Sequence, residues 1–202
     1  NDIRTELKLL NATSPFIAAK LENIVGAAGA VLNLSKELKQ ALVRTGEAIT
    51  GEPVVIEVAI LLEEAQDAAS VPSNIQICLE IDDDVDAVRV IHSLVADILR
   101  NLMTNAIDAM PEGGKITLKA HNTGHFVALE VIDTGVGIHQ QNLSKIFDLF
   151  YSTKGSSGFG LWSARTNALR NHGDLTVKSQ EGQGTTFTLL LPRAERQHHE
   201  AI

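Results

Sequence analysis

The stretch from Asp97 to Met110 has the periodicity of an amphipathic helix, and this helix limits the folds open to the chain. Its apolar residues, continued towards the N-terminus, recur at helical spacings and predict one buried side. They are Ile91, Leu94, Val95, Ile98, Leu99, Leu102 and Ala106. Asn101, Asn105 and Asp108 recur at i, i+4 and i+7, so they are expected to share the other face.

The polar face of this helix offers oxygen atoms but no strong base. Two carboxamides and one carboxylate suit a hard cation such as Mg²⁺, which takes few protein oxygens, keeps several waters and also binds phosphates. The alternative interpretation is a plain polar face of an amphipathic helix. The order of the motifs that follow favours the cation site.

Glycine-containing motifs follow the helix in a fixed order. They are Asp133-Thr134-Gly135-Val136-Gly137-Ile138, then Ile146-Phe147-Asp148-Leu149-Phe150 with Lys154, then Gly158-Phe159-Gly160-Leu161 and Gly182-Gln183-Gly184-Thr185. Together with the Asn-bearing helix, this series resembles the N, G1, F, G2 and G3 boxes of sensor histidine kinases. Those boxes form a catalytic and ATP-binding domain of the Bergerat type, which is shared with gyrase and mismatch-repair ATPases. The resemblance covers roughly the last two-thirds of the chain.

Asp133 is the candidate for recognising the adenine base. It ends a hydrophobic strand, where a buried carboxylate needs hydrogen-bond donors, and the adenine amino group is such a donor. Thr185 could support Asp133 and the base through water, while Gly135 and Gly137 let the backbone turn tightly against the ring. The resemblance implies the same role for Asp133. The alternative is a simple turn at the end of the strand.

The phosphates are expected at the glycines that open the next helix. Gly158-Phe159-Gly160-Leu161 runs directly into that helix, where free N–H groups and the helix dipole attract anions. Lys154 can reach the terminal phosphates as a point charge. The loop Tyr151–Ser157 is expected to be a mobile lid over the phosphates.

The resemblance implies a set of site residues. Asn105 is expected to bind the metal, and the expected catalytic residues are Asn101, Asn105 and Lys154. The residues expected to bind the nucleotide are Asn105, Asp108, Asp133, Gly135, Gly137, Ile138, Phe150, Lys154, Gly158, Phe159, Gly160, Leu161 and Thr185. The expected ligands are ATP and Mg²⁺.

Asn101 distinguishes between classes of enzyme. In Bergerat-type ATPases such as gyrase, a Glu one helical turn before the magnesium-binding Asn activates water, whereas Asn101 cannot act as a general base. Hydrolysis should therefore be slow, which favours a histidine kinase that passes the γ-phosphoryl group to a His, for relay to a response-regulator Asp. The alternatives are an ATP-binding pseudokinase or scaffold, and an ATPase of the same superfamily.

The expected fold class is α+β. The strands are expected in hairpins with helices between them, which gives a two-layer α/β sandwich with a mixed, mainly antiparallel sheet. A long helical segment precedes it, with an a/d heptad running from Ile17 to Leu42. We expect a partial dimerisation segment over residues 1–52, an ATP-binding catalytic domain over 53–194 and a polar tail over 195–202.

Composition excludes several partners. Hydrophobic residues make up 44% of the 202 residues, enough for a sizeable core. The net charge of −8 argues against nucleic acid, and the chain shows no apolar run long enough to span a membrane. The resemblance to histidine kinases implies a cytoplasmic homodimer, or the cytosolic part of a larger sensor, with a response regulator and its own acceptor domain as partners.

An acceptor histidine is not evident near the N-terminus, since no His precedes His92. The segment Leu10–Phe16 has the Pro spacing of an acceptor box, with Leu10 where the His would stand. The alternative is that Pro15 begins the second helix of the bundle and that the acceptor helix lies upstream of this sequence. Both interpretations remain open.

Overall fold

The computed structural model describes residues 51–152 and 157–194, together with Lys20, Ile24, Gly26 and Gly29, which are helical. The chain divides into two compact units, Asn1–Gly46 and Glu47–Ile202. The second unit contains every element named below. The rest of the predicted heptad, the segment around Leu10, Lys154 and the tail over 195–202 lie outside the described residues.

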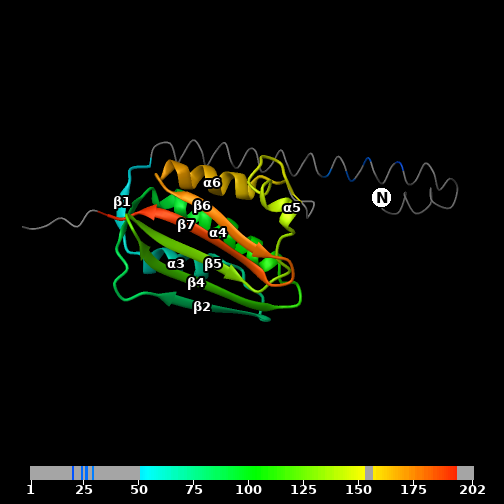
Figure 1. Cartoon of the computed structure of the whole chain (residues 1–202), viewed down its shortest axis with the longest axis horizontal. Helices are drawn as coiled ribbons and strands as arrows, with labels where there is room; N and C mark the ends of the chain where they lie inside the picture. Colours follow the sequence, from blue (N-terminus) through cyan, green and yellow to red (C-terminus); the bar gives the residue numbers. More distant parts are fainter. Residues whose placement is uncertain are drawn as a thin grey trace, which may run out of the picture. The chain divides into compact units, whose positions relative to one another are not determined.

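The second unit contains helices and strands interspersed along the chain, and Figure 1 colours them in sequence order. They are β1 (Val54–Ile56), α3 (Val58–Ala68), β2 (Ile75–Ile81), β3 (Val88–Val90), α4 (His92–Asp108), β4 (Gly114–Thr123), β5 (Phe126–Asp133), α5 (Gln140–Leu143), α6 (Gly160–Arg170), β6 (Asp174–Gln180) and β7 (Gly184–Pro192).

The main sheet has five strands in the order β2-β4-β5-β7-β6. β2 runs parallel to β4, and the other neighbouring pairs are antiparallel. β1 and β3 form a separate two-stranded antiparallel ribbon. The α+β prediction with a mixed, mainly antiparallel sheet is therefore confirmed.

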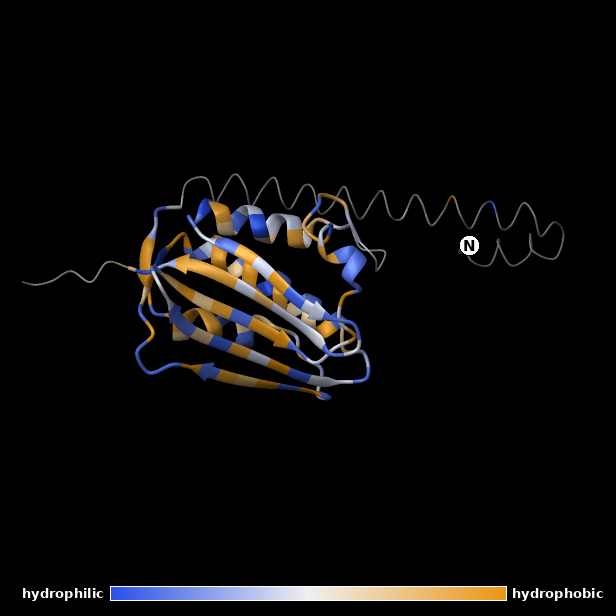
Figure 2. Ribbon diagram, viewed as in Figure 1, coloured by the Kyte–Doolittle hydropathy of each residue, from blue (hydrophilic) through white to orange (hydrophobic). Residues whose placement is uncertain are grey.

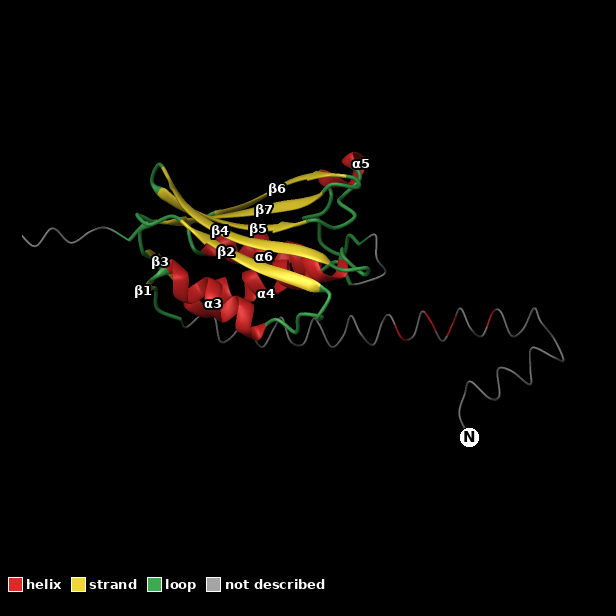
Figure 3. Ribbon diagram, turned by 90° about the horizontal axis from the view of Figure 1, so that it is seen from below, coloured by secondary structure: helices red, strands yellow, loops and turns green. Residues whose placement is uncertain are grey.

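The three long helices α3, α4 and α6 cover one face of the sheet, as the view from below shows (Figure 3). Strand residues alternate in hydropathy, and Figure 2 shows this alternation along the strands. On β5, Val127, Leu129 and Val131 are buried towards the helices, while Glu130 and Ile132 are only half-buried on the other face. The core consequently lies between the sheet and a single layer of helices.

α4 is the central helix of that layer and contacts both α3 and α6. Its predicted apolar stripe is confirmed with one adjustment, because Ile91 is the N-cap residue and is only half-buried. The buried residues of α4 are Leu94, Val95, Ile98, Leu99, Leu102, Met103 and Ala106. This stripe fixes the rotation of the helix and therefore the direction in which Asn101 and Asn105 project.

Two predicted helices were wrong in part. The sequence pattern of Val54–Ala69 predicts one short helix, but Val54–Ile56 pairs with Val88–Val90 as a strand. The pattern of Gln141–Phe150 also predicts a helix, but only Gln140–Leu143 forms one and successive turns follow. The turns bury Ile146 and pack the neighbouring Phe147 edge-on against Phe187, which shows that tertiary packing overrides local propensity there.

Candidate functional site

Asp133 ends β5 at the edge of the buried layer. Its side chain lies on the core face, the residue is only 4% exposed, and Oδ1 accepts a hydrogen bond from the Gly135 N–H at 2.8 Å. Its neighbours across the sheet are Ile116 on β4 and Thr185 on β7. The strand therefore places an acidic group, with a buried hydroxyl beside it, where the hydrophobic core ends.

The loop after Asp133 is clamped between α4 and the β6–β7 turn. The Val136 N–H donates to the Ala109 carbonyl at 3.0 Å, and the Gly182 N–H donates to the Val136 carbonyl at 2.8 Å. A Cβ at Gly135 would lie 2.6 Å from the Ala109 oxygen, and a Cβ at Gly137 would lie 2.1 Å from the Gln180 oxygen. The two glycines of this motif are therefore required for close packing of the loop.

Gly184 brings the last motif against Asp133. Its φ is +99°, and a Cβ at this position would lie 2.0 Å from the Asp133 carbonyl oxygen. The third glycine motif therefore shares one site with the first, although about fifty residues of sequence separate them.

Sequence reasoning missed Ser179, which connects these segments. Its hydroxyl donates to the Gly184 carbonyl at 2.8 Å, accepts from the Ile138 N–H at 2.8 Å and lies 3.0 Å from Thr185 Oγ1. The available signal was a serine at an inward position of β6, in register with Leu175 and Val177. A polar residue on the buried face of a strand needs partners and is therefore worth examining.

The N-terminus of α6 faces the polar side of α4. A Cβ at Gly160 would lie 3.4 Å from Asn101 Oδ1, so the start of the helix and this carboxamide are neighbours. The first N–H groups of an α-helix lack partners within the helix, and the helix dipole makes its N-terminus positive. This end of the site therefore combines an amide oxygen with N–H donors suited to an anion.

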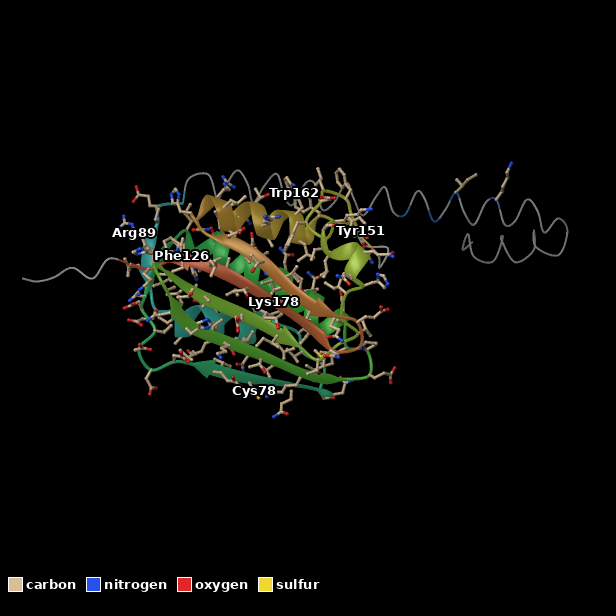
Figure 4. All side chains as sticks on the ribbon, viewed as in Figure 1. Cys78, Arg89, Phe126, Tyr151, Trp162 and Lys178 are labelled. Carbon is tan, nitrogen blue, oxygen red and sulfur yellow. The ribbon has the colours of Figure 1, made fainter. Side chains whose placement is uncertain are left out.

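The loop that precedes α6 is closed at its base. The Phe150 N–H donates to the Gly158 carbonyl at 3.2 Å, and the Tyr151 hydroxyl donates to Asn142 Oδ1 at 2.8 Å. Tyr151 lies beside α5 in Figure 4. Phe150 has a positive φ of 66° and is 50% exposed. Lys154 falls on residues outside the described part of this loop.

The remaining predicted residues support the site in different ways. Ile138 and Leu161 are half-buried and pack against the core. Phe159 lies with its ring 5.2 Å from that of Trp162, which Figure 4 labels on α6. Both aromatic residues lie at the start of α6.

The two ends of the site are connected by α4. Asn101, Asn105 and Ala109 recur at i, i+4 and i+8 and so lie along one side of the helix. Ala109 contacts the Asp133 loop, and Asn101 is next to Gly160. Eight residues of helix separate these contacts by about 12 Å, a length that an extended nucleoside triphosphate can span.

Asp108 lies apart from these contacts. It is exposed and lines a pocket of about 330 Å³ between α3 and α4, together with Ala65, Arg100 and Thr104. The side of α4 that faces the glycine motifs thus ends in Ala109 rather than Asp108. The i, i+7 spacing places Asp108 on the same face as Asn101, but it does not predict which neighbours that face contacts at the end of the helix.

The fold and the arrangement of these residues suit a nucleotide-binding domain, because α4 connects the buried Asp133 at one end with the start of α6 at the other. The family model described as histidine kinase-, DNA gyrase B- and HSP90-like ATPase matches residues 90–195. The chain belongs to this family, and membership implies that it binds ATP.

The relatives named here are kinases. The chain is 33% identical over 123 residues to sporulation kinase E of Bacillus subtilis, a match that covers 59% of the chain and 16% of the relative. It is 35% identical over 129 residues to the sensor histidine kinase ZraS of Escherichia coli, covering 63% of the chain and 27% of the relative. The chain thus spans only a minor part of the length of these relatives.

Solved structures share the fold. The catalytic domain of histidine kinase ThkA superposes with a TM-score of 0.62 at 26% identity, over 70% of this chain and 96% of that one. The mycobacterial sensor histidine kinase MprB gives a TM-score of 0.60 at 22% identity, over 71% and 98% respectively, which is a likeness of fold alone. Within residues 51–152 and 157–194, no helix has the length and apolar character of a membrane span.

Proposed function

We propose that this chain is the ATP-binding catalytic domain of a two-component sensor histidine kinase, which transfers the γ-phosphoryl group of Mg-ATP to a histidine of a dimerisation domain. The observation that carries the proposal is the connection of two unlike sites along α4: the buried Asp133 at one end and Asn101 beside Gly160 at the other. The sensor kinases among its relatives support the same activity.

The proposed recognition of adenine uses Asp133. Its buried carboxylate accepts the exocyclic amino group of the base, while Gly135 and Gly137 keep the loop close enough for the ring to lie against backbone. Guanine presents a carbonyl oxygen at the equivalent position, and two acceptors would repel each other. This arrangement selects ATP over GTP.

The proposed phosphate site uses the start of α6. The N–H groups near Gly160 bind phosphate oxygens, and Lys154 supplies a positive charge from the loop. Asn105 and Asn101 present amide oxygens that fit a hard cation with few protein ligands, and Mg²⁺ bound there would neutralise phosphate charge. Phosphoryl transfer depends mainly on such positioning and neutralisation, so no residue needs to act as a covalent nucleophile.

The proposed phosphoryl acceptor is a protein histidine rather than water. Asn101 occupies the position from which a carboxylate would activate water, and a carboxamide cannot take the proton. A response regulator would then receive the phosphoryl group on an Asp. We propose a homodimer of a cytoplasmic sensor, or of the cytosolic part of a larger one, as the acting form.

Phosphotransfer to an added acceptor tests the proposal directly. The full chain is mixed with a histidine-bearing dimerisation domain and γ-labelled ATP, and acid-labile label on the acceptor is measured. Label on the histidine is expected, together with slow release of free phosphate. ATP binding without label would favour the scaffold, and rapid release of phosphate without an acceptor would favour the ATPase.

ATP affinity tests the role of Asp133. Asp133→Ala should weaken ATP binding by about 2–3 kcal/mol, because the amino group loses its buried acceptor. The measurement is a calorimetric titration, with Asp174→Ala on β6 as a matched acidic control. Unchanged affinity in Asp133→Ala would show that Asp133 does not bind the base.

A further inference from the structure

Ser179 lies where three segments of the candidate nucleotide site meet. Its hydroxyl contacts the loop after Asp133 through the Ile138 N–H, and the start of β7 through the Gly184 carbonyl and the Thr185 hydroxyl. From its place on β6, this one hydroxyl therefore connects the loop after Asp133 with the start of β7. It touches Thr185, the buried neighbour of Asp133.

The directions of these three hydrogen bonds follow from counting protons. A serine hydroxyl has one proton to donate and two lone pairs that accept. The Gly184 carbonyl can only accept, so it takes the proton of Ser179. The Ile138 N–H can only donate, so it occupies one lone pair. The remaining lone pair must take the proton of Thr185, which fixes the Thr185–Ser179 bond with Thr185 as donor.

This assignment leaves Thr185 without a proton for any ligand. Its oxygen can then only accept, and Asp133 Oδ1 likewise accepts, from the Gly135 N–H. The two residues are directly opposite each other on β5 and β7, and opposite side chains on one face have Cβ atoms about 4.5–5.5 Å apart. A group that meets both must therefore donate, as an amino group or a bridging water does.

We infer that Ser179 is a positioning residue that sets the base specificity of the site by holding the proton of Thr185. With Ser179 in place, the site favours an exocyclic amino group and disfavours a carbonyl oxygen at the same position. Without it, the Thr185 hydroxyl is free to rotate and to donate to such a carbonyl. The inference rests on the proposed nucleotide site. It adds the residue that determines whether this site accepts or donates hydrogen bonds towards the base.

The test compares ATP with inosine triphosphate, which carries a carbonyl in place of the amino group of adenine. Dissociation constants for both are measured with the full chain and with Ser179→Ala. The preference for ATP over inosine triphosphate is expected to fall about tenfold in Ser179→Ala. This is the change in affinity that one hydrogen bond typically provides. Ser179→Thr keeps the hydroxyl and should keep most of the preference.

A control variant and further substitutions distinguish a specific effect of Ser179 from a general loss of structure. Thr176→Ala removes a hydroxyl from the same strand on the opposite face of the sheet, and should leave the preference unchanged. If Ser179→Ala does not fold, Ser179→Cys fills the same space with a weaker acceptor and should also lower the preference. In a Thr185→Val background, Ser179→Ala should have no further effect on the ratio.

The outcomes separate the inference from the proposed function. A wild-type chain that binds neither nucleotide would contradict the proposed function itself. If wild type binds ATP but Ser179→Ala weakens both nucleotides equally, Ser179 only holds the loops together and the inference is overturned. Equal affinity of wild type for the two nucleotides would overturn it as well.

Discussion

At the scale of single residues, the glycines of the site are needed for two separable reasons. Gly137 has a φ of +69°, and a Cβ there would lie 2.1 Å from the Gln180 carbonyl oxygen. Gly182 has a similar φ of +76°, but no atom lies within 4 Å of its Cβ position. The pair therefore separates the cost of a left-handed backbone from the cost of a steric clash.

We expect Gly137→Ala to destabilise the fold more than Gly182→Ala. The Gly182 variant should lose about 1 kcal/mol from the left-handed backbone alone, and the Gly137 variant at least about 2 kcal/mol more. Urea unfolding measures both free energies. Equal losses in the two variants would mean that the loop can move away from β6 and is not clamped.

The sequence predicts some positions of the candidate site and does not predict others. Asp133 could be predicted because it interrupts a hydrophobic strand, and the glycines because they cluster. Ser179 could not, because its role depends on three hydrogen bonds to residues as far as forty-one positions away. Asp108 stays a prediction from the i, i+7 spacing, and it is Ala109 that contacts the loop of the first glycine motif.

At the scale of elements, α4 and α6 are tied together by one buried carboxamide. The Ile91 N–H, at the start of α4, donates to Asn171 Oδ1 at 2.7 Å. The Asn171 amide donates in turn to the Asn167 carbonyl at 3.0 Å, and Asn171 is only 3% exposed. The end of α6 therefore caps the beginning of α4. This contact fixes the position of the two helices relative to each other, and these helices carry the phosphate end of the candidate site.

We expect Asn171→Ala to cost about 2 kcal/mol of stability, because it leaves a buried N–H without a partner. Thermal or urea unfolding measures the loss. Leu169→Ala, on the same helix but with a 58% exposed side chain, serves as the control and should change stability by less than about 0.5 kcal/mol. A loss no larger than that of the control would contradict the capping role.

Elements were predictable where their pattern is long and local. α4 follows from periodicity, although it begins at His92, five residues before the predicted Asp97. Alternating apolar residues predict a hairpin of Lys115–His121 with Phe126–Ile132, and β4 and β5 extend these strands by one or two residues. β1 was missed because Val54–Ile56 is too short to show alternation, and its partner Val88–Val90 is distant in sequence. The turns after α5 were missed because they depend on packing against Phe187 of β7.

At the scale of the whole domain, the two ends of the sheet serve different purposes. Thr185 near the start of β7 belongs to the candidate site, and Arg193 follows the other end of the strand, about 26 Å away at 3.3 Å per residue. Arg193 pairs with the buried Asp86 and donates to the Gly124 carbonyl at 2.9 Å. The far end is therefore held by an ion pair that contacts the β4–β5 turn.

We expect Arg193→Ala to lower the free energy of unfolding of the domain. The molecules that remain folded should bind ATP with the same affinity as the unsubstituted chain. The substitution removes an ion-pair partner of the buried Asp86, which should cost about 3 kcal/mol. Urea unfolding and ATP titration at low temperature measure the two quantities. Arg89→Ala, an exposed residue of β3 labelled in Figure 4, is the control. A weaker ATP affinity in folded Arg193→Ala would contradict the separation of the two ends.

The most direct test of the account is an amide chemical-shift titration of the full chain with Mg²⁺ and a non-hydrolysable ATP analogue. We predict that Gly135 and Gly137 shift together with Asn105 and Gly160, with one dissociation constant for all four. Adenosine alone should shift only the first pair. If only one pair responds to the analogue, or if the two pairs respond at different concentrations, Asp133 and the amides of α4 do not hold one nucleotide between them.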